Sequence, residues 1–236
     1  MGKPYETSNK VEKTMRTMEG MIRELSEALE GKKYVLIGGI ASAIHGIQRY
    51  TRDADIVLTV TKEELHDLIK KLKEHGFEIS KSYEEIFTDK LLKGQPAKIL
   101  YSNEYSVDFR VESYTIDKES IQRAQPYQIY DRIYLVATPE DIVVYKMARF
   151  SGRDQFDIQG IAERNGNKLD IAYIKKSAEQ LIKEIKEPLL KKDVKDHFPR
   201  CLSLIEKSIS QGKSVKENSI DQEQPQEQHH GRGRHR

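Results

Sequence analysis

The chain has 236 residues, and its 40 Lys and Arg nearly balance its 38 Asp and Glu, which leaves a net charge of +2. This length suffices for one large domain or two small ones with a buried core, and the charge balance excludes a strong overall field toward nucleic acid or membrane. A single cysteine excludes an internal disulfide framework. The sequence carries no secretion leader pattern and no long apolar run, so we expect a cytoplasmic protein with no membrane partner.

Apolar residues recur at helical spacing near the start of the chain, with charged residues between them. They are Val11, Met15, Met18, Ile22, Leu25 and Leu29. This pattern predicts an amphipathic helix within residues 1–30 that packs on the body of the protein.

A strand, a glycine turn and a helix are predicted next. The apolar run from Lys33 to Ile37 ends at Gly38 and Gly39, and a helical pattern begins at Ala41. A second strand is predicted from Asp53 to Val60 because its residues alternate or are β-branched.

A capping box at Thr61 to Glu64 predicts the start of another helix, which Gly76 would end. Three strand candidates follow it. They are Phe77–Ser80, Ala97–Tyr101 and Tyr105–Val111, and the last has the clearest alternation.

Helical signals dominate after Val136. Thr138 to Asp141 combines an N-cap, a proline at the first helical position and acidic residues, which predicts a helix to about Phe150. Helical periodicity continues to about Ile209, and breaks are expected at Asn165-Gly166-Asn167, Pro188 and Pro199. Beyond Gln211 the chain is too polar to bury a core and should be disordered.

The expected fold class is therefore α/β (α+β), with a mixed sheet, flanking helices and a C-terminal helical subdomain. The expected parts are an amphipathic helix in 1–30, a catalytic core in 31–137, a helical subdomain in 138–210 and a disordered tail in 211–236.

Three aspartates are the candidates for chemistry. Asp53 and Asp55 are two residues apart on a predicted strand, so they project from the same face. Asp108 lies on the polar face of a later strand and completes a triad of acids if the two strands are neighbours. Such carboxylates repel one another unless a cation neutralises them, which points to Mg²⁺ or Mn²⁺. The alternatives are a chance pair on a surface strand, and for Asp108 an edge-strand acid paired with Arg110.

The glycine turn supplies a second part of a site. Gly38 and Gly39 let backbone N–H groups approach a ligand closely, and the following helix presents the positive end of its dipole. Phosphate binding, paired carboxylates and no nucleophilic side chain together indicate phosphoryl-type transfer. A dinucleotide-binding turn is excluded, because the next glycine is Gly46 and G-x-G-x-x-G is absent.

Several basic residues are candidates for phosphate binding. Arg49 and Arg52 precede the acidic strand and bind either a triphosphate or neighbouring acids. Lys146, Arg149 and Arg153 have the spacing of one helical stripe. This stripe is either a positively charged surface that binds phosphates or a solvent-exposed face whose charges pair with Asp154 and Asp157.

These residues resemble a known superfamily, the DNA polymerase β-like nucleotidyltransferases, and within it the AbiEii/MenT-type branch. The resemblance covers roughly residues 30 to 165. It is carried by Gly38-Gly39, by His45-Gly46, Arg49, Thr51 and Arg52 before Asp53-Ala54-Asp55, and by Asp108. The segment from Thr138 to Arg164 extends it, with a Pro-Glu-Asp helix start, Lys146, Arg149, Arg153-Asp154 and Asp157. The superfamily often has Ser where this chain has Gly39, which removes one hydroxyl from the phosphate contact.

The resemblance implies two metal ions held by Asp53, Asp55 and Asp108, nucleotide binding by Gly38, Gly39, Arg49, Arg52 and Lys146, and transfer of a nucleoside monophosphate from NTP to an acceptor hydroxyl. Toxin-antitoxin members of the branch modify RNA 3′ ends or proteins, and a small-molecule acceptor is a third option. The lysine-rich C-terminal helices and the Arg-rich tail favour RNA. The alternative function is a non-catalytic nucleotide- or partner-binding module of the same fold.

Overall fold

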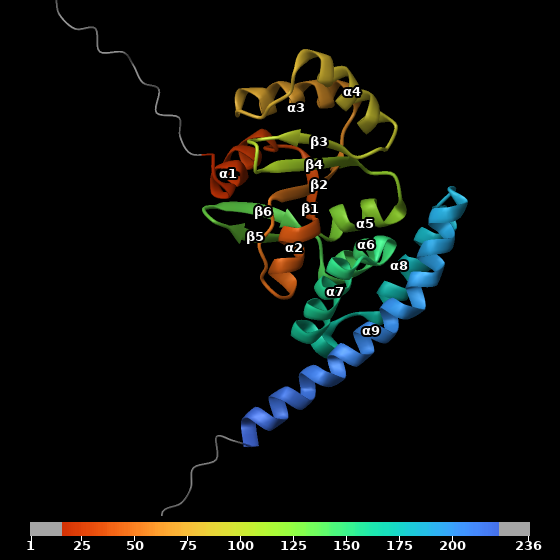
Figure 1. Ribbon diagram of the computed structural model, residues 1–236. Helices are drawn as coiled ribbons and strands as arrows, with labels where there is room; N and C mark the ends of the chain where they lie inside the picture. The colour runs from red at the N-terminus through yellow and green to blue at the C-terminus, as the bar shows by residue number, and fades with distance from the viewer. Residues whose placement is uncertain (1–15, 222–236) are drawn as a thin grey trace, which may run out of the picture. The chain divides into compact units, whose positions relative to one another are not determined.

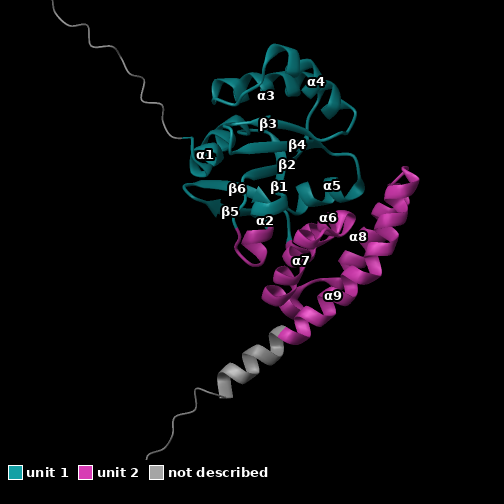
Figure 2. Ribbon diagram, viewed as in Figure 1, with its two compact units in different colours: residues 1–41, 50–138 teal, residues 42–49, 139–236 magenta. Residues whose placement is uncertain are grey.

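The computed structural model describes residues 16–221, with side chains up to residue 211 (Figure 1). The chain forms two compact units (Figure 2). Unit 1 comprises residues 1–41 and 50–138, and unit 2 comprises residues 42–49 and 139–236. Helix α2 (Gly38–His45) therefore contributes its first half to unit 1 and its second half to unit 2.

The described part of unit 1 is built on a six-stranded mixed sheet with packed helices, which confirms the predicted fold class. The strand order is β3-β4-β2-β1-β6-β5. The pairs β2/β4 and β1/β6 are parallel, and the other neighbouring pairs are antiparallel. The strands are β1 (Lys33–Ile37), β2 (Asp53–Thr59), β3 (Ala97–Leu100), β4 (Ser106–Val111), β5 (Gln125–Ile129) and β6 (Arg132–Val136).

Helices α1 (Met18–Ala28), α3 (Lys62–Glu74), α4 (Lys81–Leu92) and α5 (Thr115–Arg123) complete unit 1. The predicted N-terminal helix is confirmed from Met18 onward, and its expected residues Val11 and Met15 lie outside the described residues. The capping box before α3 is also confirmed, because Thr61 and Glu64 exchange both of its hydrogen bonds.

The prediction of a strand at Phe77–Ser80 is wrong. Only Glu78 forms an isolated bridge, to Leu100 of β3. The Ser80 hydroxyl accepts a hydrogen bond from the Tyr83 N–H at 3.2 Å and so begins α4, a helix that the sequence pattern did not reveal. Helix α5 and the β5–β6 hairpin are likewise found only in the structure.

The two faces of the sheet differ in character. Val107 and Phe109 of β4 point into the core, where Phe87 of α4 meets the Phe109 ring edge-on at 6.0 Å. The opposite face carries the aspartates at the beginning of β2 and β4. Further along that face, α5 packs on β1 and β2, and Arg110 forms an ion pair with the buried Asp117. The strand beginnings are thus left half-exposed.

Unit 2 is helical in its described part. Its helices are α6 (Pro139–Arg149), α7 (Gly152–Asn165), the short 3₁₀ helix η1 (Gly166–Lys168), α8 (Ile171–Glu184) and α9 (Pro188–Asp221). The predicted helix start at Pro139 and the predicted breaks near Gly166 and at Pro188 are confirmed, since α8 ends at Glu184 and α9 begins at Pro188.

The expected break at Pro199 is wrong, because α9 continues through it. Proline removes one N–H donor from a helix interior, which ordinarily kinks or ends the helix. Here α9 packs against α6, α7 and α8, and it buries Val194, Cys201 and Ile205 on the two sides of Pro199. Burial also raises the pKa of the Cys201 thiol to about 12, so this thiol stays protonated.

The backbone of α9 extends to Asp221, beyond the residue at which we expect order to end. The rest of the expected tail, including its Arg-rich end, lies outside the described residues. Between residues 16 and 221, no helix has the length and apolar composition that crossing a bilayer requires.

Two glycines allow the end of α2 to contact α7 within unit 2. A Cβ placed on Gly160 would lie 2.9 Å from the Ile47 backbone nitrogen, and one on Gly46 would lie 2.8 Å from the Ile161 nitrogen. Backbone atoms cannot yield as a flexible side chain does. The close packing of these segments therefore requires glycine at both positions.

We predict that Gly160→Ala lowers the free energy of unfolding by about 2 kcal/mol, because the new methyl group overpacks this contact. Thermal and denaturant unfolding would measure the change. Gly152→Ala is the matched control on the same helix, since its Cβ would meet nothing within 4 Å. Equal stabilities of the two variants would contradict the proposed backbone contact.

Candidate active site

The pairing of β2 with β4 brings the three predicted aspartates together. In this parallel register Asp55 lies opposite Asp108, and Asp53 lies opposite Ser106. Adjacent strands are about 4.8 Å apart, so the three carboxylates share one small area of one face. All three residues are partly exposed. Strand β3 forms the edge beyond β4, so Asp108 is not the edge-strand acid of the alternative interpretation.

A lysine that the sequence analysis missed lies among these acids. Lys98 of β3 is opposite Asp108 in the antiparallel register, and its Nζ lies 2.7 Å from Asp108 Oδ2. Partial burial disfavours the charged ammonium, but the hydrogen bond to Asp108 and the charges of the three aspartates outweigh it and raise the pKa of Lys98. Lys98 is therefore the counter-ion of the acidic cluster.

Hydroxyl groups orient Asp53 and the Lys98 counter-ion. Thr51 Oγ1 donates a hydrogen bond to Asp53 Oδ1 at 2.6 Å, immediately before β2 begins. The Lys98 ammonium donates a second hydrogen bond to Ser106 Oγ at 3.3 Å. Both groups restrict the rotamers of the charged side chains beside them.

Gly38 connects the glycine turn to the acids. Its φ of +70° is a left-handed conformation, and a Cβ built on it would lie 1.8 Å from Asp55 Oδ2. Glycine is thus required here both by the backbone angle and by the space that Asp55 occupies. Because α2 begins at this point, its N-terminal end lies at the same end of β1 as the aspartates.

Among the described residues, the group of potential metal ligands whose atoms all lie within 4.8 Å of one another is Glu24, Glu27 and His75. These residues have partners within the protein, since His75 Nδ1 lies 2.8 Å from Glu24 Oε2 and Arg132 forms an ion pair with Glu27. The three aspartates form no such group.

Two predicted phosphate ligands, Arg49 and Lys146, belong to unit 2 and contact Asp157. Arg49 donates two hydrogen bonds to its carboxylate, from Nε at 2.7 Å and from Nη2 at 2.9 Å. Lys146 Nζ lies 2.7 Å from the same carboxylate and is itself 94% buried. Bidentate guanidinium binding and low exposure make this a strong pair.

Asp154 is held in the same way by Arg149, whose Nε and Nη2 each donate at 2.8 Å. Arg149, Lys146 and Arg153 do not form one helical stripe, so that prediction is wrong. Helix α6 ends at Arg149 and α7 begins at Gly152, because Phe150 between them adopts a left-handed φ of 50°. Arg153 is exposed on the second helix.

The electrostatics of these two carboxylates follow from their partners. Burial disfavours ionisation of Asp154 and Asp157, but hydrogen bonds from Arg149 and Ser151 to Asp154, and from Arg49 and Lys146 to Asp157, outweigh it. The pKa of each carboxyl is therefore lowered below its ordinary value. Both are charged at neutral pH and stabilise unit 2 in that form.

The family model described as "Nucleotidyl transferase AbiEii toxin, Type IV TA system" matches residues 21–229. The chain belongs to this AbiEii family. The class of reaction that it catalyses is thus nucleotidyl transfer, as the resemblance predicts. A search among curated proteins found no match.

Solved structures also resemble this AbiEii protein. A putative nucleotidyltransferase from H. pylori is 15% identical, with a TM-score of 0.44 over 84% of this chain and 95% of that one. An antigenic nucleotidyltransferase-like protein from Paracoccidioides brasiliensis is 18% identical, with a TM-score of 0.42 over 75% and 91% of the two chains. The family assignment does not depend on these likenesses.

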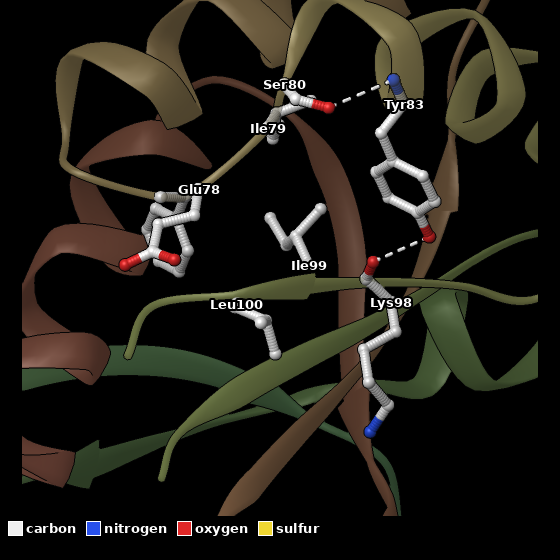
Figure 3. Close-up of a pocket in the computed structure, with 8 residues that line it drawn as sticks. Glu78, Ile79, Ser80, Tyr83, Lys98, Ile99 and Leu100 are labelled. Carbon is white, nitrogen blue, oxygen red and sulfur yellow. Dashed lines mark hydrogen bonds between the residues drawn. The ribbon is translucent and has the colours of Figure 1, made fainter. Parts of the chain in front are cut away.

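In this AbiEii protein, a hydrogen bond to Tyr83 also fixes the backbone of Lys98, on the side away from the acids. The Tyr83 hydroxyl donates to the Lys98 carbonyl at 2.9 Å, and Figure 3 shows the lysine side chain pointing away from the tyrosine. Both residues line a cavity of about 760 Å³ along β3, together with Glu78, Ile99 and Leu100. The backbone of Lys98 is thus fixed while its ammonium reaches the aspartates.

We predict that Lys98→Met lowers the free energy of unfolding by about 1 kcal/mol at low ionic strength, because it leaves three carboxylates without their counter-ion. The deficit should shrink as salt rises, since mobile ions screen the repulsion. Lys93→Met is the control, because the Lys93–Asp89 pair is exposed and isolated. A deficit that salt does not change would rule out the counter-ion role.

A second prediction concerns acid stability. Carboxyls with a lowered pKa stabilise the fold above their ordinary pKa of about 3.9, and this contribution is lost as pH falls below it. Asp157→Asn should cost about 3 kcal/mol at pH 7, because Lys146 and Arg49 lose their buried partner. The cost should diminish toward pH 2.

Unfolding measured between pH 2 and 7 would test this prediction. The control is Asp193→Asn at an exposed position of α9, which should unfold like the parent. A cost for Asp157→Asn that is constant across the pH range would show that charge is not the cause.

Proposed function

We propose that this protein transfers a nucleoside monophosphate from an NTP to an acceptor hydroxyl at a site formed by Asp53, Asp55 and Asp108. The observation that supports it best is the parallel β2–β4 register, which sets Asp55 opposite Asp108 with Asp53 on the same face. Membership of the AbiEii family supports the class of reaction. A non-catalytic binding module is disfavoured, because it would have no need to concentrate three negative charges.

The residues of this cluster fit a divalent cation. They offer carboxylate oxygens, the donors that Mg²⁺ and Mn²⁺ prefer, and they already require a positive counter-charge, which Lys98 supplies. Mg²⁺ or Mn²⁺ bound there would neutralise charge on the phosphates and lower the pKa of the acceptor hydroxyl. Asp53, Asp55 and Asp108 are the proposed ligands.

Proton transfer and phosphate binding are assigned to groups of the chain itself. Asp108 accepts the proton of the acceptor hydroxyl, whose oxygen bonds to the α-phosphorus as the bond to pyrophosphate breaks. We assign contacts with phosphate oxygens to the backbone N–H groups at Gly38 and Gly39, because α2 begins there and the positive end of a helix dipole favours anions. We assign triphosphate binding further to Arg52. Arg49 and Lys146, which belong to unit 2 and contact Asp157, stay predicted phosphate ligands.

The proposed acceptor is an RNA 3′ end, ahead of a protein hydroxyl or a small molecule. The family's description as a toxin of a type IV system supports a role in a toxin-antitoxin pair, with an antitoxin as partner. The predicted basic stripe is interrupted at Phe150, and α9 carries charges of both signs, as in the Lys192–Asp196 pair.

We predict that incubation with NTP and Mg²⁺ or Mn²⁺ adds one nucleoside monophosphate mass to the acceptor, detected by mass spectrometry of RNA and of protein. Asp108→Asn should abolish transfer and leave NTP binding largely intact, because its carboxylate serves the attacking hydroxyl. The double variant Asp53→Asn, Asp55→Asn should lose metal-dependent NTP binding in calorimetry.

Asp131→Asn is the matched control, because this half-exposed acid lies on the β5–β6 hairpin and should leave both measurements unchanged. NTP binding of equal strength in EDTA would refute the metal site. Transfer at the parental rate by Asp108→Asn would refute its role as the proton acceptor. If protein gains the nucleoside monophosphate mass and RNA does not, the acceptor is a protein hydroxyl and not an RNA 3′ end.

A further inference from the structure

An aromatic pair stands at the beginning of the two strands that carry the acids. The Tyr50 hydroxyl lies 3.4 Å from the Tyr105 hydroxyl, and the Arg52 guanidinium lies 5.7 Å from the centre of the Tyr50 ring. Tyr50 is 67% exposed, far more than a tyrosine that serves the core. All three residues belong to unit 1, as do the aspartates.

We propose that Tyr50, Arg52 and Tyr105 form a stacking platform for a nucleobase at the transfer site. This inference rests on the proposed function and specifies one chemical class of substrate for it. An exposed tyrosine ring beside a guanidinium presents two planar groups on which an unpaired base stacks, whichever base it is. A phosphate or an aliphatic acceptor would gain nothing from the ring.

The backbone holds this platform at a defined distance from the acids. The Ser106 N–H donates to the Arg52 carbonyl at 3.1 Å, and the Tyr101 and Ser102 N–H groups both donate to the Tyr105 carbonyl. Tyr105 precedes Asp108 by three residues on an extended segment, which places them roughly 10 Å apart at about 3.3 Å per residue. A nucleotide whose phosphate lies at the acids therefore has its base within reach of the platform.

The hydrogen bond to Tyr50 keeps the pair together. It contributes most to raising the pKa of Tyr105, so the Tyr105 hydroxyl stays protonated. The link limits the rotation of the exposed Tyr50 ring, so less conformational entropy is lost when a base stacks on it.

The absence of tryptophan from the sequence allows a direct test. Tyr50→Trp keeps an aromatic face and introduces the protein's single indole fluorophore. We expect ATP with Mg²⁺, or a single-stranded oligoadenylate, to quench its fluorescence, whereas tripolyphosphate with Mg²⁺ and an abasic oligonucleotide should not. The control is Tyr130→Trp, an exposed position on the β5–β6 hairpin that should respond to no probe.

Binding by the side-chain variants gives a second measurement. Tyr50→Ala should weaken binding of the base-bearing probe on the order of tenfold, with no change for tripolyphosphate, and Tyr50→Phe should keep most of the affinity because it retains the ring. Quenching by ATP assigns the base to the donor nucleotide, and quenching by oligoadenylate alone assigns it to the acceptor. Either result supports the platform.

The platform is overturned if no base-bearing probe quenches the Tyr50→Trp variant and Tyr50→Ala binds all probes as the parent does. Tripolyphosphate separates this failure from that of the proposed function. If its Mg²⁺-dependent binding persists and requires Asp53 and Asp55, only the platform is wrong. If that binding is absent as well, the proposed function fails with it.

Discussion

The parallel pairing of β2 with β4 is the constraint on which the rest of unit 1 depends. It sets Asp55 directly across from Asp108, although like charges opposite one another destabilise a sheet by several tenths of a kcal/mol. The third strand in this row, β3, compensates by placing the Lys98 ammonium 2.7 Å from Asp108. Gly38 then completes the arrangement, because only a residue without a side chain leaves space for the Asp55 carboxylate.

Unit 2 buries negatively charged groups that need positively charged partners. Its carboxylates at Asp154 and Asp157 are almost fully buried, and three basic side chains surround them. A buried carboxylate is costly unless it is paired and hydrogen-bonded, so these contacts are needed for the stability of the helices themselves. Two of these cations, Arg49 and Lys146, are also predicted phosphate ligands. Substitution of Arg49 or Lys146 would therefore affect stability and binding together, and only measurements of both would separate the two roles.

Local patterns in the sequence were sufficient for much of the fold. The strands at Lys33–Ile37 and Asp53–Thr59, the capping box at Thr61 and the helix start at Pro139 depend on side-chain alternation and on hydrogen bonds within a few residues. The three aspartates of the proposed site were selected in the same way, from spacing and alternation along single strands. Helix α4 was missed because it buries little beyond Phe87 and Leu91 and so has a weak apolar stripe.

Tertiary structure alone decided which strands are neighbours and which charged side chains form ion pairs. Lys98 is ten residues from Asp108 in the chain, and no periodicity shows that β3 lies beside β4 in a register that pairs them. Packing on three helices likewise overrides the helix-breaking tendency of Pro199. The left-handed backbone of Phe150 places Lys146 and Arg153 on two different helices, although their spacing in the sequence predicts one. The sequence by itself determined the local elements and the acidic residues; the counter-ion and the placement of the cations depend on contacts between distant segments, which local patterns do not encode.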